Sequence, residues 1–263
     1  MSNIAIAILS FNHPELTRRA VHAAAKADPT APIFLLHNGT DSKHETRLLG
    51  SLDPAIGARL VHLRLQTNAG FSGGGNYLLG HIFAEGYHWI LFLTNDCELK
   101  SRAVAPACPG LYAPLIYRRN ETQVDSLGAV FKPWSGRLRH IRDEKEARGQ
   151  CAPHGETPSR RRFHPNYFYV PGTAFWLDRK TWQTIGPFDE SLHTYWEDVD
   201  FSARAHLHGA YVGVHPETAI VHSVGKTCHK LPFYTQYLFQ RNRRVVSQRY
   251  SPKWLRPWQS LYL

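Results

Sequence analysis

The sequence predicts an α/β protein with a Rossmann-like, mostly parallel sheet flanked by helices and a smaller mixed region beside it. Short apolar segments alternate with helical segments through the first hundred residues, which is typical of a parallel sheet covered on both faces. Polar residues follow each apolar segment, and open α/β sheets bind ligands at the carboxyl ends of their strands. The 263 residues, 43% of them hydrophobic, are enough for one sizeable core.

The first hundred residues are expected to contain four strands and two helices. Apolar runs that end in turn residues predict strands over 4–9, 32–36, 59–65 and 88–93. Pro14 suits a first helical turn and indicates a helix over 13–27. A second helix is expected over 75–86, after a glycine-rich turn.

Beyond residue 100 the pattern is less regular. Residues 132–165 are rich in charged residues, Gly and Pro, and predict a long exposed excursion. The elements expected after it are a strand over 168–177 interrupted at Pro171-Gly172-Thr173, helices over 178–185 and 198–208, and a strand pair over 211–214 and 219–222. A last helix, 234–250, mixes basic with aromatic residues. That mixture suits a membrane-surface or partner-facing helix, and equally ordinary packing.

The charge and composition limit the class of partner. A net charge of +10 favours anionic partners, such as nucleic acid, an acidic membrane surface or phosphorylated small molecules. No nucleic-acid-binding signature is found, so nucleic acid is not expected. Four widely spaced cysteines fit a reducing cytosol, and the sequence contains neither a secretory leader nor an apolar run of about 18 residues. A cytoplasmic protein is therefore expected.

An acidic cluster stands out against this basic background. Five carboxylates lie within the thirteen residues 188–200, interleaved with aromatic residues that could form a platform for a sugar. Crowded like charges raise one another's pKa, which is typical of sites that handle protons. The alternative is an acidic first helical turn, which the helix dipole favours.

Two strand ends and a glycine-rich segment are further candidate ligand sites. The glycines of Asn68–Asn76 allow a close backbone approach to a ligand at a helix N-terminus, although a flexible turn would look the same. Asp96 ends an apolar strand and could hold a divalent cation, or belong to an ordinary Asn-Asp turn. His222 ends another apolar strand and is either a structural histidine or a further metal ligand.

Taken in order, these segments resemble the inverting glycosyltransferases of family 2, which have the GT-A fold. The resemblance covers roughly residues 3–250. Within that family the chain looks most like the rhamnosyltransferase-like branch, which builds bacterial cell-surface polysaccharides. The matching segments are Ser10-Phe11-Asn12, His37-Asn38-Gly39-Thr40, Asn68–Asn76, Leu93–Asp96, Pro171-Gly172-Thr173, Gly186–Glu190, Trp196–Asp200, Gly209 and His222.

The resemblance implies a role for each match. Glu197 and Asp198 would be the catalytic acidic pair, with Asp198 the general base, and Asp96 and His222 would hold Mg²⁺ or Mn²⁺. The implied donor-binding residues are Ser10, Phe11, Asn12, His37 and Asn38 at the base and ribose, Asn68, Gly70, Phe71, Gly74 and Asn76 along the nucleotide sugar, and Thr94, Asn95 and Asp96 at the diphosphate. The implied acceptor-side residues are Gly172, Thr173 and Trp196.

The resemblance also implies an organisation and a reaction. A GT-A catalytic domain would span residues 1–230, with a nucleotide-sugar half over 1–100 and an acceptor half over 101–230. The basic and aromatic residues of the tail, 231–263, separately predict that it lies at the inner face of the cytoplasmic membrane. The enzyme would transfer a sugar from a dTDP- or UDP-sugar, dTDP-rhamnose being one, to a hydroxyl of a glycan or lipid-linked acceptor.

Three departures from the family pattern favour an alternative. His37 stands where the family usually has Asp, and Thr94 stands where it has an acid or Asn, with Glu98 as a possible replacement ligand. The Pro-rich segment 100–111 replaces a helix. The alternative is a catalytically inactive sugar-nucleotide-binding or scaffold subunit of a polysaccharide assembly complex.

Overall fold

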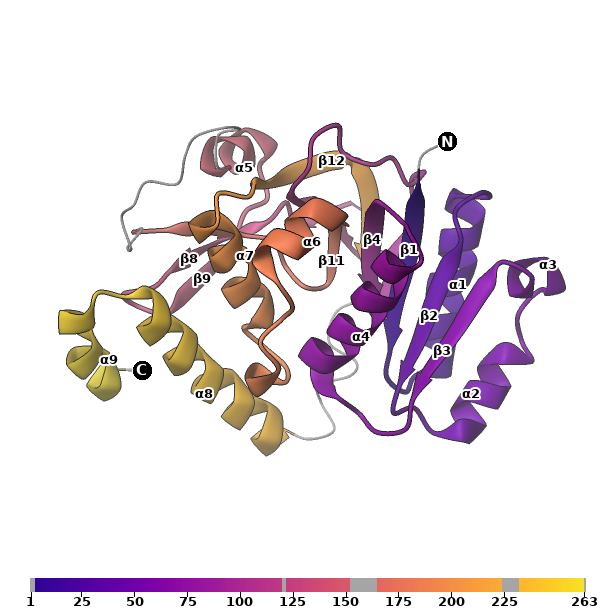
Figure 1. The fold of residues 1–263 in the computed structure, drawn as a ribbon, viewed down its shortest axis with the longest axis horizontal. Helices are drawn as coiled ribbons and strands as arrows, with labels where there is room; N and C mark the ends of the chain where they lie inside the picture. Colours follow the sequence, from indigo (N-terminus) through magenta and orange to yellow (C-terminus); the bar gives the residue numbers. More distant parts are fainter. Residues whose placement is uncertain (1–2, 120–121, 152–164, 224–231, 263) are drawn as a thin grey trace.

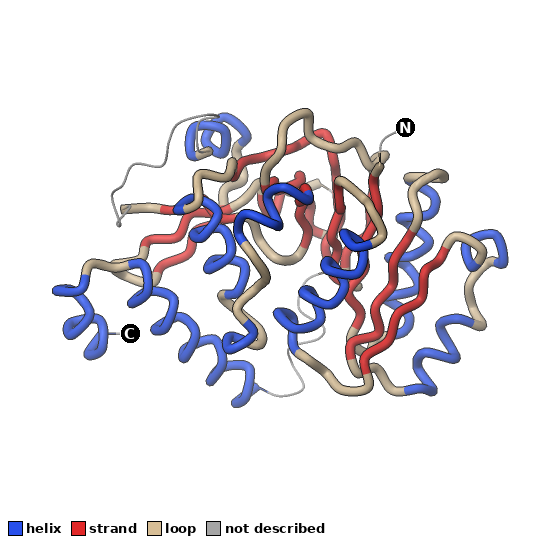
Figure 2. The backbone as a smooth tube through the Cα atoms, in the orientation of Figure 1, coloured by secondary structure: helices blue, strands red, loops and turns tan. Residues whose placement is uncertain are grey.

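The computed structural model describes residues 3–119, 122–151, 165–223 and 232–262. It has a nine-stranded, mostly parallel sheet with helices on both faces and a separate three-stranded antiparallel sheet (Figures 1 and 2). The predicted fold class is therefore confirmed. In the large sheet the strand order is β3-β2-β1-β4-β11-β6-β12-β5, and β7 pairs with β6.

The N-terminal half supplies one continuous parallel part of the large sheet. β3, β2, β1 and β4 lie side by side and pair in parallel. Its elements are β1 (Ile4–Ser10), α1 (Pro14–Ala27), β2 (Ile33–Asn38), α2 (Ser42–Leu49), α3 (Pro54–Gly57), β3 (Leu60–Leu65), α4 (Gly70–Ala84) and β4 (Trp89–Thr94). The short helices α2 and α3 are additions to the expected pattern.

The second half completes the large sheet and forms the small one. β11 (Ala174–Asp178) pairs antiparallel with both β4 and β6 (Leu111–Arg118), so the parallel order is interrupted there. The other strands of the large sheet are β5 (Cys97–Leu99), β7 (Val124–Ser126) and β12 (Val212–His222). The small sheet contains β8 (Ala129–Lys132), β9 (Arg137–His140) and β10 (Tyr167–Tyr169).

The helices of the second half cover both sheets. They are α5 (Glu144–Gln150), α6 (Arg179–Ile185), the 3₁₀ turn η1 (Glu190–Leu192), α7 (Glu197–Leu207), α8 (Pro232–Tyr250), the turn η3 (Lys253–Leu255) and α9 (Arg256–Tyr262). Val199 of α7 and Val246 of α8 pack with Phe131 and Tyr167 of the small sheet in one apolar cluster. Figure 1 shows α8 and α9, in yellow, on the side of the molecule away from β1–β3.

The core lies on both faces of β1, which explains why this strand shows no polar alternation. Ile4, Ile6 and Ile8 pack into the cluster that contains residues of α1, whereas Ala5 and Ala7 pack into the cluster that contains residues of α4. A strand that is buried on both faces is expected to be apolar throughout. This sandwich fixes the carboxyl end of β1, next to the ends of β2 and β4.

Three predicted elements differ from the structure. The helix expected over 75–86 begins at Gly70, so the glycine-rich segment is the first turns of α4 rather than a turn before it. The strand pair over 211–222 is the single strand β12. The exposed excursion over 132–165 contains β9 and α5 where it is described, and its residues 152–164 lie outside the described ranges.

The irregularity within β12 has a local cause. His215 pairs with Pro114 of β6, and the next pair is Ala219 with Leu115, so three residues of β12 have no partner in the register. Proline has no N–H to donate to a strand ladder, and Pro114 and Pro216 face this point from both strands. The sequence over 211–222 therefore predicts two strands, although β12 is continuous.

Helix α8 is tied to α7 and to the segment before it by polar contacts. The Arg249 Nη1 atom lies 2.6 Å from Asp200 Oδ1, and its Nη2 atom lies 2.8 Å from Asp189 Oδ2. Tyr250 Oη donates to Asp200 Oδ1 at 2.7 Å. Among the helices in the described ranges, none is both long and apolar enough to cross a membrane.

Candidate active site

A cavity of about 370 Å³ opens at the carboxyl ends of the central strands. It brings together residues from segments as distant as Leu9 and Phe239. The predicted site residues that line it are Phe11, Asn38, Asn68, Gly70, Phe71, Thr94, Asn95, Asp96, Gly172, Thr173, Trp196, Glu197, Asp198 and His222. The donor, metal, acceptor and base candidates therefore share one cavity.

Asp96 and His222 lie together in this cavity. β12 and β5 pair His222 with Cys97, which places the imidazole Nε2 atom 3.3 Å from Asp96 Oδ2. Burial raises the pKa of Asp96, but hydrogen bonds with His222 and Thr94 outweigh it, and the net effect lowers that pKa. Asp96 is therefore a carboxylate at neutral pH.

The side chains of Asp96 and His222 fit a hard divalent cation that also binds a diphosphate. A carboxylate and an imidazole are two protein ligands, and Mg²⁺ sites commonly combine one or two carboxylates with substrate phosphates. Cys97 lies close enough to be a third ligand, but burial and the charge of Asp96 raise the pKa of its thiol well above the usual value. A neutral thiol is a poor ligand for such an ion.

Thr94 orients the carboxylate of Asp96. Its hydroxyl donates to Asp96 Oδ1 at 2.6 Å and lies 3.2 Å from the Thr173 carbonyl oxygen. Glu98, in contrast, forms an ion pair with Arg19 and does not line the cavity. The replacement ligand expected at Glu98 is therefore wrong, since its carboxylate is used by α1.

The acidic pair stands at the start of α7 and differs in hydrogen bonding. Asp198 accepts the Gly172 N–H through Oδ2 at 2.9 Å and the Val199 N–H through Oδ1 at 2.8 Å. Glu197 is only 5% exposed, and its Oε2 atom has no hydrogen-bond partner in the described parts of the chain. Two donors therefore stabilise the carboxylate of Asp198, whereas that of Glu197 lacks a donor at Oε2.

This difference decides which of the two carries a proton. Burial raises the pKa of Glu197 well above its usual value, and the charge of Asp198 raises it further. Burial also raises the pKa of Asp198, but the hydrogen bonds from Gly172 and Val199 oppose that rise. When two carboxyl groups share a site, the less solvated one is protonated first. The arrangement favours a neutral Glu197 beside an ionised Asp198.

The loop before this pair has a strained backbone. Among the residues that the structure describes, five non-glycine residues have positive φ, and His193, Tyr195 and Trp196 are three of them. Such conformations cost about 1–3 kcal/mol each and persist where the surroundings hold them. Asn242 of α8 stabilises this loop conformation. Its Nδ2 atom donates to the carbonyl oxygens of Leu192, Thr194 and Tyr195 at 2.7, 3.0 and 2.7 Å.

The glycine-rich segment is clamped by Asn38. The Asn38 Nδ2 atom donates to the Gly70 carbonyl at 2.8 Å, and its Oδ1 accepts the Ala69 N–H at 3.0 Å. Gly70 has φ +72°, and a Cβ there would lie 2.4 Å from the His193 carbonyl oxygen. Glycine at position 70 therefore lets the start of α4 touch the strained loop.

The five clustered acids have separate roles. Asp189 and Asp200 pair with Arg249, while the carboxylate of Glu190 accepts from Asn76 Nδ2 at 2.9 Å. Glu197 and Asp198 are the two that face the cavity. The cluster therefore combines structural contacts with a candidate proton-handling pair.

Five predicted donor residues do not line this cavity. Ser10 shares a hydrogen bond with Thr17 at 2.8 Å, and Gly74 packs against the Asn38 side chain. Asn76 ties α4 to the segment of Phe188 and Glu190. Asn12 lines a separate hollow beside Phe11, and His37 is buried behind the strand ends.

Several lining residues were not predicted. They are Leu9, Leu138, Tyr169, Thr194, Tyr195 and Phe239. Tyr195 adjoins the predicted Trp196, so its place could have been extended from that motif. Leu138 and Phe239 lie on β9 and α8, and no local pattern marks a residue that tertiary packing brings to a distant site.

No protein-family model matches the chain, and no curated protein matches it in sequence. Solved structures do resemble it. GalNAc-T7, crystallised with UDP, GalNAc and Mn²⁺, gives a TM-score of 0.64 at 16% identity, over 92% of this chain and 47% of its own. S. aureus TarS gives 0.55 at 14% identity, over 92% of this chain and 39% of its own.

A third structure is the mannosyltransferase PcManGT from Pyrobaculum calidifontis, in complex with GDP-Man and Mn²⁺. It gives a TM-score of 0.53 at 10% identity, over 99% of this chain and 73% of its own. The chain has a GT-A fold. It spans less than half the length of GalNAc-T7 and of TarS.

Proposed function

We propose that this GT-A protein is an inverting glycosyltransferase that moves a sugar from a nucleotide donor to an acceptor hydroxyl. The observation that carries the proposal is Asp198, a hydrogen-bonded carboxylate in the same cavity as the Asp96–His222 pair. GalNAc-T7 and the mannosyltransferase share the fold, and their structures contain UDP and GDP-Man with Mn²⁺. The same cavity thus offers candidates for both halves of a sugar transfer.

Asp96 and His222 are the residues that would hold a divalent cation. A bound Mg²⁺ or Mn²⁺ neutralises negative charge on a leaving diphosphate. The part of this chain is to present a lowered-pKa carboxylate and an imidazole at the ends of β4 and β12. Asn38 and Asn68 shape the neighbouring wall, because Asn38 donates to the Gly70 carbonyl and Asn68 accepts the Gly70 N–H at the start of α4.

Asp198 acts as the general base in this proposal. The acceptor oxygen attacks the anomeric carbon, the bond from that carbon to the diphosphate breaks, and the hydroxyl proton passes to the Asp198 carboxylate. Attack on the face opposite the leaving group inverts the anomeric centre, and no covalent enzyme intermediate is required. Proton removal by a positioned base contributes about 10²–10⁴-fold to the rate.

Asp198→Asn tests this assignment directly. We expect transfer to fall by about 10²–10⁴-fold while donor binding is retained, because the amide cannot accept the proton. Glu197→Gln is the matched control and should keep much more of the rate, since Glu197 is already neutral. An Asp198→Asn enzyme with an unchanged rate would reject the base. Wild-type protein that binds a donor but never transfers or hydrolyses it would favour the inactive scaffold subunit.

The donor we propose is a dTDP- or UDP-sugar, dTDP-rhamnose among them, as in the rhamnosyltransferase-like branch of family 2 that the motifs resemble. A thermal-shift comparison of dTDP, UDP, GDP and their sugars, with and without Mn²⁺, tests this. Ligands that bind the folded state raise its melting temperature. We expect a Mn²⁺-dependent rise with dTDP- or UDP-sugars that Asp96→Asn abolishes. A rise without metal would remove Asp96 and His222 as ligands, and a rise with GDP alone would overturn the donor.

The proposed setting is the inner face of the cytoplasmic membrane, where a glycan or lipid-linked acceptor for cell-surface polysaccharide would be found. The net charge of +10 suits anionic headgroups. Trp254 and Trp258, near the C-terminus, are 73% and 68% exposed. Exposed Trp beside basic residues is typical of a protein that rests on a membrane surface.

A further inference from the structure

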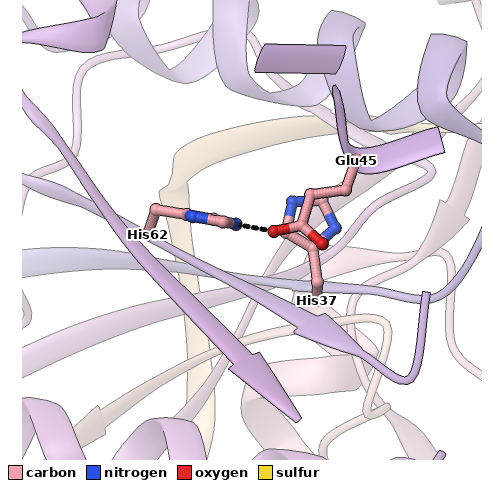
Figure 3. Close-up of side chains that lie close together, drawn as sticks. All are labelled: His37, Glu45 and His62. Carbon is pink, nitrogen blue, oxygen red and sulfur yellow. Dashed lines mark ion pairs between the residues drawn. The ribbon is translucent and has the colours of Figure 1, made fainter. Parts of the chain in front are cut away.

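A second group of metal-binding side chains lies behind the donor-side strand ends. His37 at the end of β2, His62 of β3 and Glu45 of α2 offer ligand atoms that all lie within 4.8 Å of one another. The two imidazole rings are 4.8 Å apart between centroids, and His62 Nε2 lies 3.0 Å from Glu45 Oε1 (Figure 3). The parallel register places His37 opposite Arg64, two residues from His62 on the same face of the sheet.

His37 is the unusual member of this group. It is 1% exposed, and neither of its ring nitrogens has a hydrogen-bond partner among the described residues. Buried polar atoms are normally paired, and leaving one unpaired costs about 1–3 kcal/mol. Burial, together with the nearby charges of His62 and Arg64, lowers the pKa of His37 to about 4. The ring is therefore neutral near pH 7, which is the form that ligates metals.

We propose that His37, His62 and Glu45 form a site for a divalent transition metal, with Zn²⁺ the best-suited ion. Two imidazoles and a carboxylate make a common three-ligand set for zinc that leaves one position open. Zinc bonds of about 2.0–2.2 Å place tetrahedral ligand atoms roughly 3.4 Å apart, so the widest separation in the group would close by up to about 1.4 Å on binding. His62 is exposed and can make that movement.

This site differs in chemistry from the Asp96–His222 pair. Two imidazoles favour Zn²⁺ over Mg²⁺ or Mn²⁺, which prefer oxygen ligands. It uses side chains of β2, β3 and α2, and the cavity that holds Asp96 is lined by none of the three. Zinc binding here therefore stands or falls independently of the proposed sugar transfer.

Arg64 supplies a distinctive prediction. Its Nη1 atom lies 3.3 Å from Glu45 Oε2, so its positive charge competes with a cation for that carboxylate. Removing the charge with Arg64→Ala should strengthen zinc binding. Removing a ligand with His62→Ala or Glu45→Gln should weaken it by more than the 10–100-fold that loss of an outer-shell partner costs.

The test uses the full chain without an affinity tag, stripped with a chelator and titrated with Zn²⁺ by calorimetry. Co²⁺ titrations report through visible absorption whether the bound ion has tetrahedral coordination, which hydrated Co²⁺ does not have. All proteins also carry Asp96→Asn, which removes the other candidate centre. His44→Ala is the matched control, because His44 is an exposed histidine adjacent to Glu45.

We expect one zinc ion per chain, unchanged binding in His44→Ala, tighter binding in Arg64→Ala, and loss of binding in His62→Ala and Glu45→Gln. Zinc should also raise the melting temperature of the parent protein and not that of the ligand variants, which separates lost binding from misfolding. Absence of zinc binding in the parent, or equal affinity in His62→Ala, would overturn the proposal.

Discussion

The neighbouring acids Glu197 and Asp198 show how hydrogen bonds to a carboxylate decide which of two buried acids carries the proton. Both follow the strained turn at Trp196, yet Asp198 receives two backbone N–H donors while Glu197 Oε2 receives none. Desolvation then favours the neutral form of Glu197. A protonated neighbour leaves Asp198 free of a second negative charge, which suits its proposed function as a base.

This pairing predicts a stability gain in Glu197→Gln that depends on pH. The raised pKa of Glu197 means that the folded state holds its proton more tightly than the unfolded state. Its stabilising contribution is therefore complete below the ordinary Glu pKa and is lost as pH rises towards the folded-state pKa. Glutamine does not titrate, so the variant should become more stable relative to wild type as pH rises through this window.

The gain should not exceed about 1.4 kcal/mol per pH unit. The free energy of unfolding in urea, measured at a series of pH values, checks it. Glu144→Gln, which removes an exposed carboxylate paired with Arg148, is the control for the loss of an acidic side chain. A constant difference between Glu197→Gln and wild type at every pH would mean that Glu197 titrates normally.

At the scale of the elements, α8 holds the loop before α7, and its sequence did not predict this function. Its basic and aromatic residues are compatible with a membrane surface or with packing, and Val246 and Tyr250 do pack in the core. Asn242, between two arginines, is fully buried and holds the strained loop before α7. The helix therefore positions the acidic pair although it contributes only Phe239 to the cavity.

Asn242→Ala should therefore reduce both stability and turnover. The substitution leaves buried carbonyl oxygens unpaired, which costs about 1–3 kcal/mol, and it releases the positive-φ residues at 193–196. Urea unfolding and steady-state kinetics measure the two effects. Arg244→Ala, an exposed position on the same helix, should change neither. Unchanged kinetics in Asn242→Ala would show that the loop holds its conformation without α8.

Periodicity predicted the first half of the chain better than the second. The strands β1–β4 are short apolar runs with turn residues at their ends, so the local pattern was enough. β6 contains Pro114, and β12 contains Pro216 at the irregular point of their pairing. Such strands are stabilised by their neighbours against the local signal, and β7–β9 are too short to show a period.

The site was predictable to the extent that strand ends carry ligand residues. Asp96 follows β4 by two residues and His222 ends β12, and the structure places Asp96 Oδ2 3.3 Å from His222 Nε2. His37 also follows an apolar run, but its ring faces α2 and His62 rather than the cavity. The face of the sheet to which a strand-end side chain points depends on the register of the strand, and a shift of one residue moves that side chain to the opposite face.

At the scale of the whole molecule, exposed tryptophans and a positive net charge predict binding to anionic membranes. Each Lys or Arg near such a surface contributes about 1 kcal/mol, and Trp prefers the headgroup region. The protein should sediment with vesicles containing phosphatidylglycerol and not with pure phosphatidylcholine, and added salt should release it. Trp254→Ser with Trp258→Ser should weaken this binding.

Tyr77→Ser is the matched control for this experiment, because Tyr77 is 43% exposed and belongs to α4, not to the C-terminal helices. Equal sedimentation with both kinds of vesicle would argue against an electrostatic membrane contact. Full binding by the double tryptophan variant would show that charge alone holds the protein there.

The position of β4 between β1 and β11 has a consequence for synthesis. β11 is encoded about eighty residues after β4 ends, so the edge of β4 (Trp89–Thr94) that does not pair with β1 stays open for roughly 4–16 s at ordinary translation rates. An open, hydrophobic strand edge readily pairs with other chains. The nascent protein is therefore prone to aggregation until β11 emerges and pairs with β4. We expect ribosome-associated chaperones to protect the chain during this time.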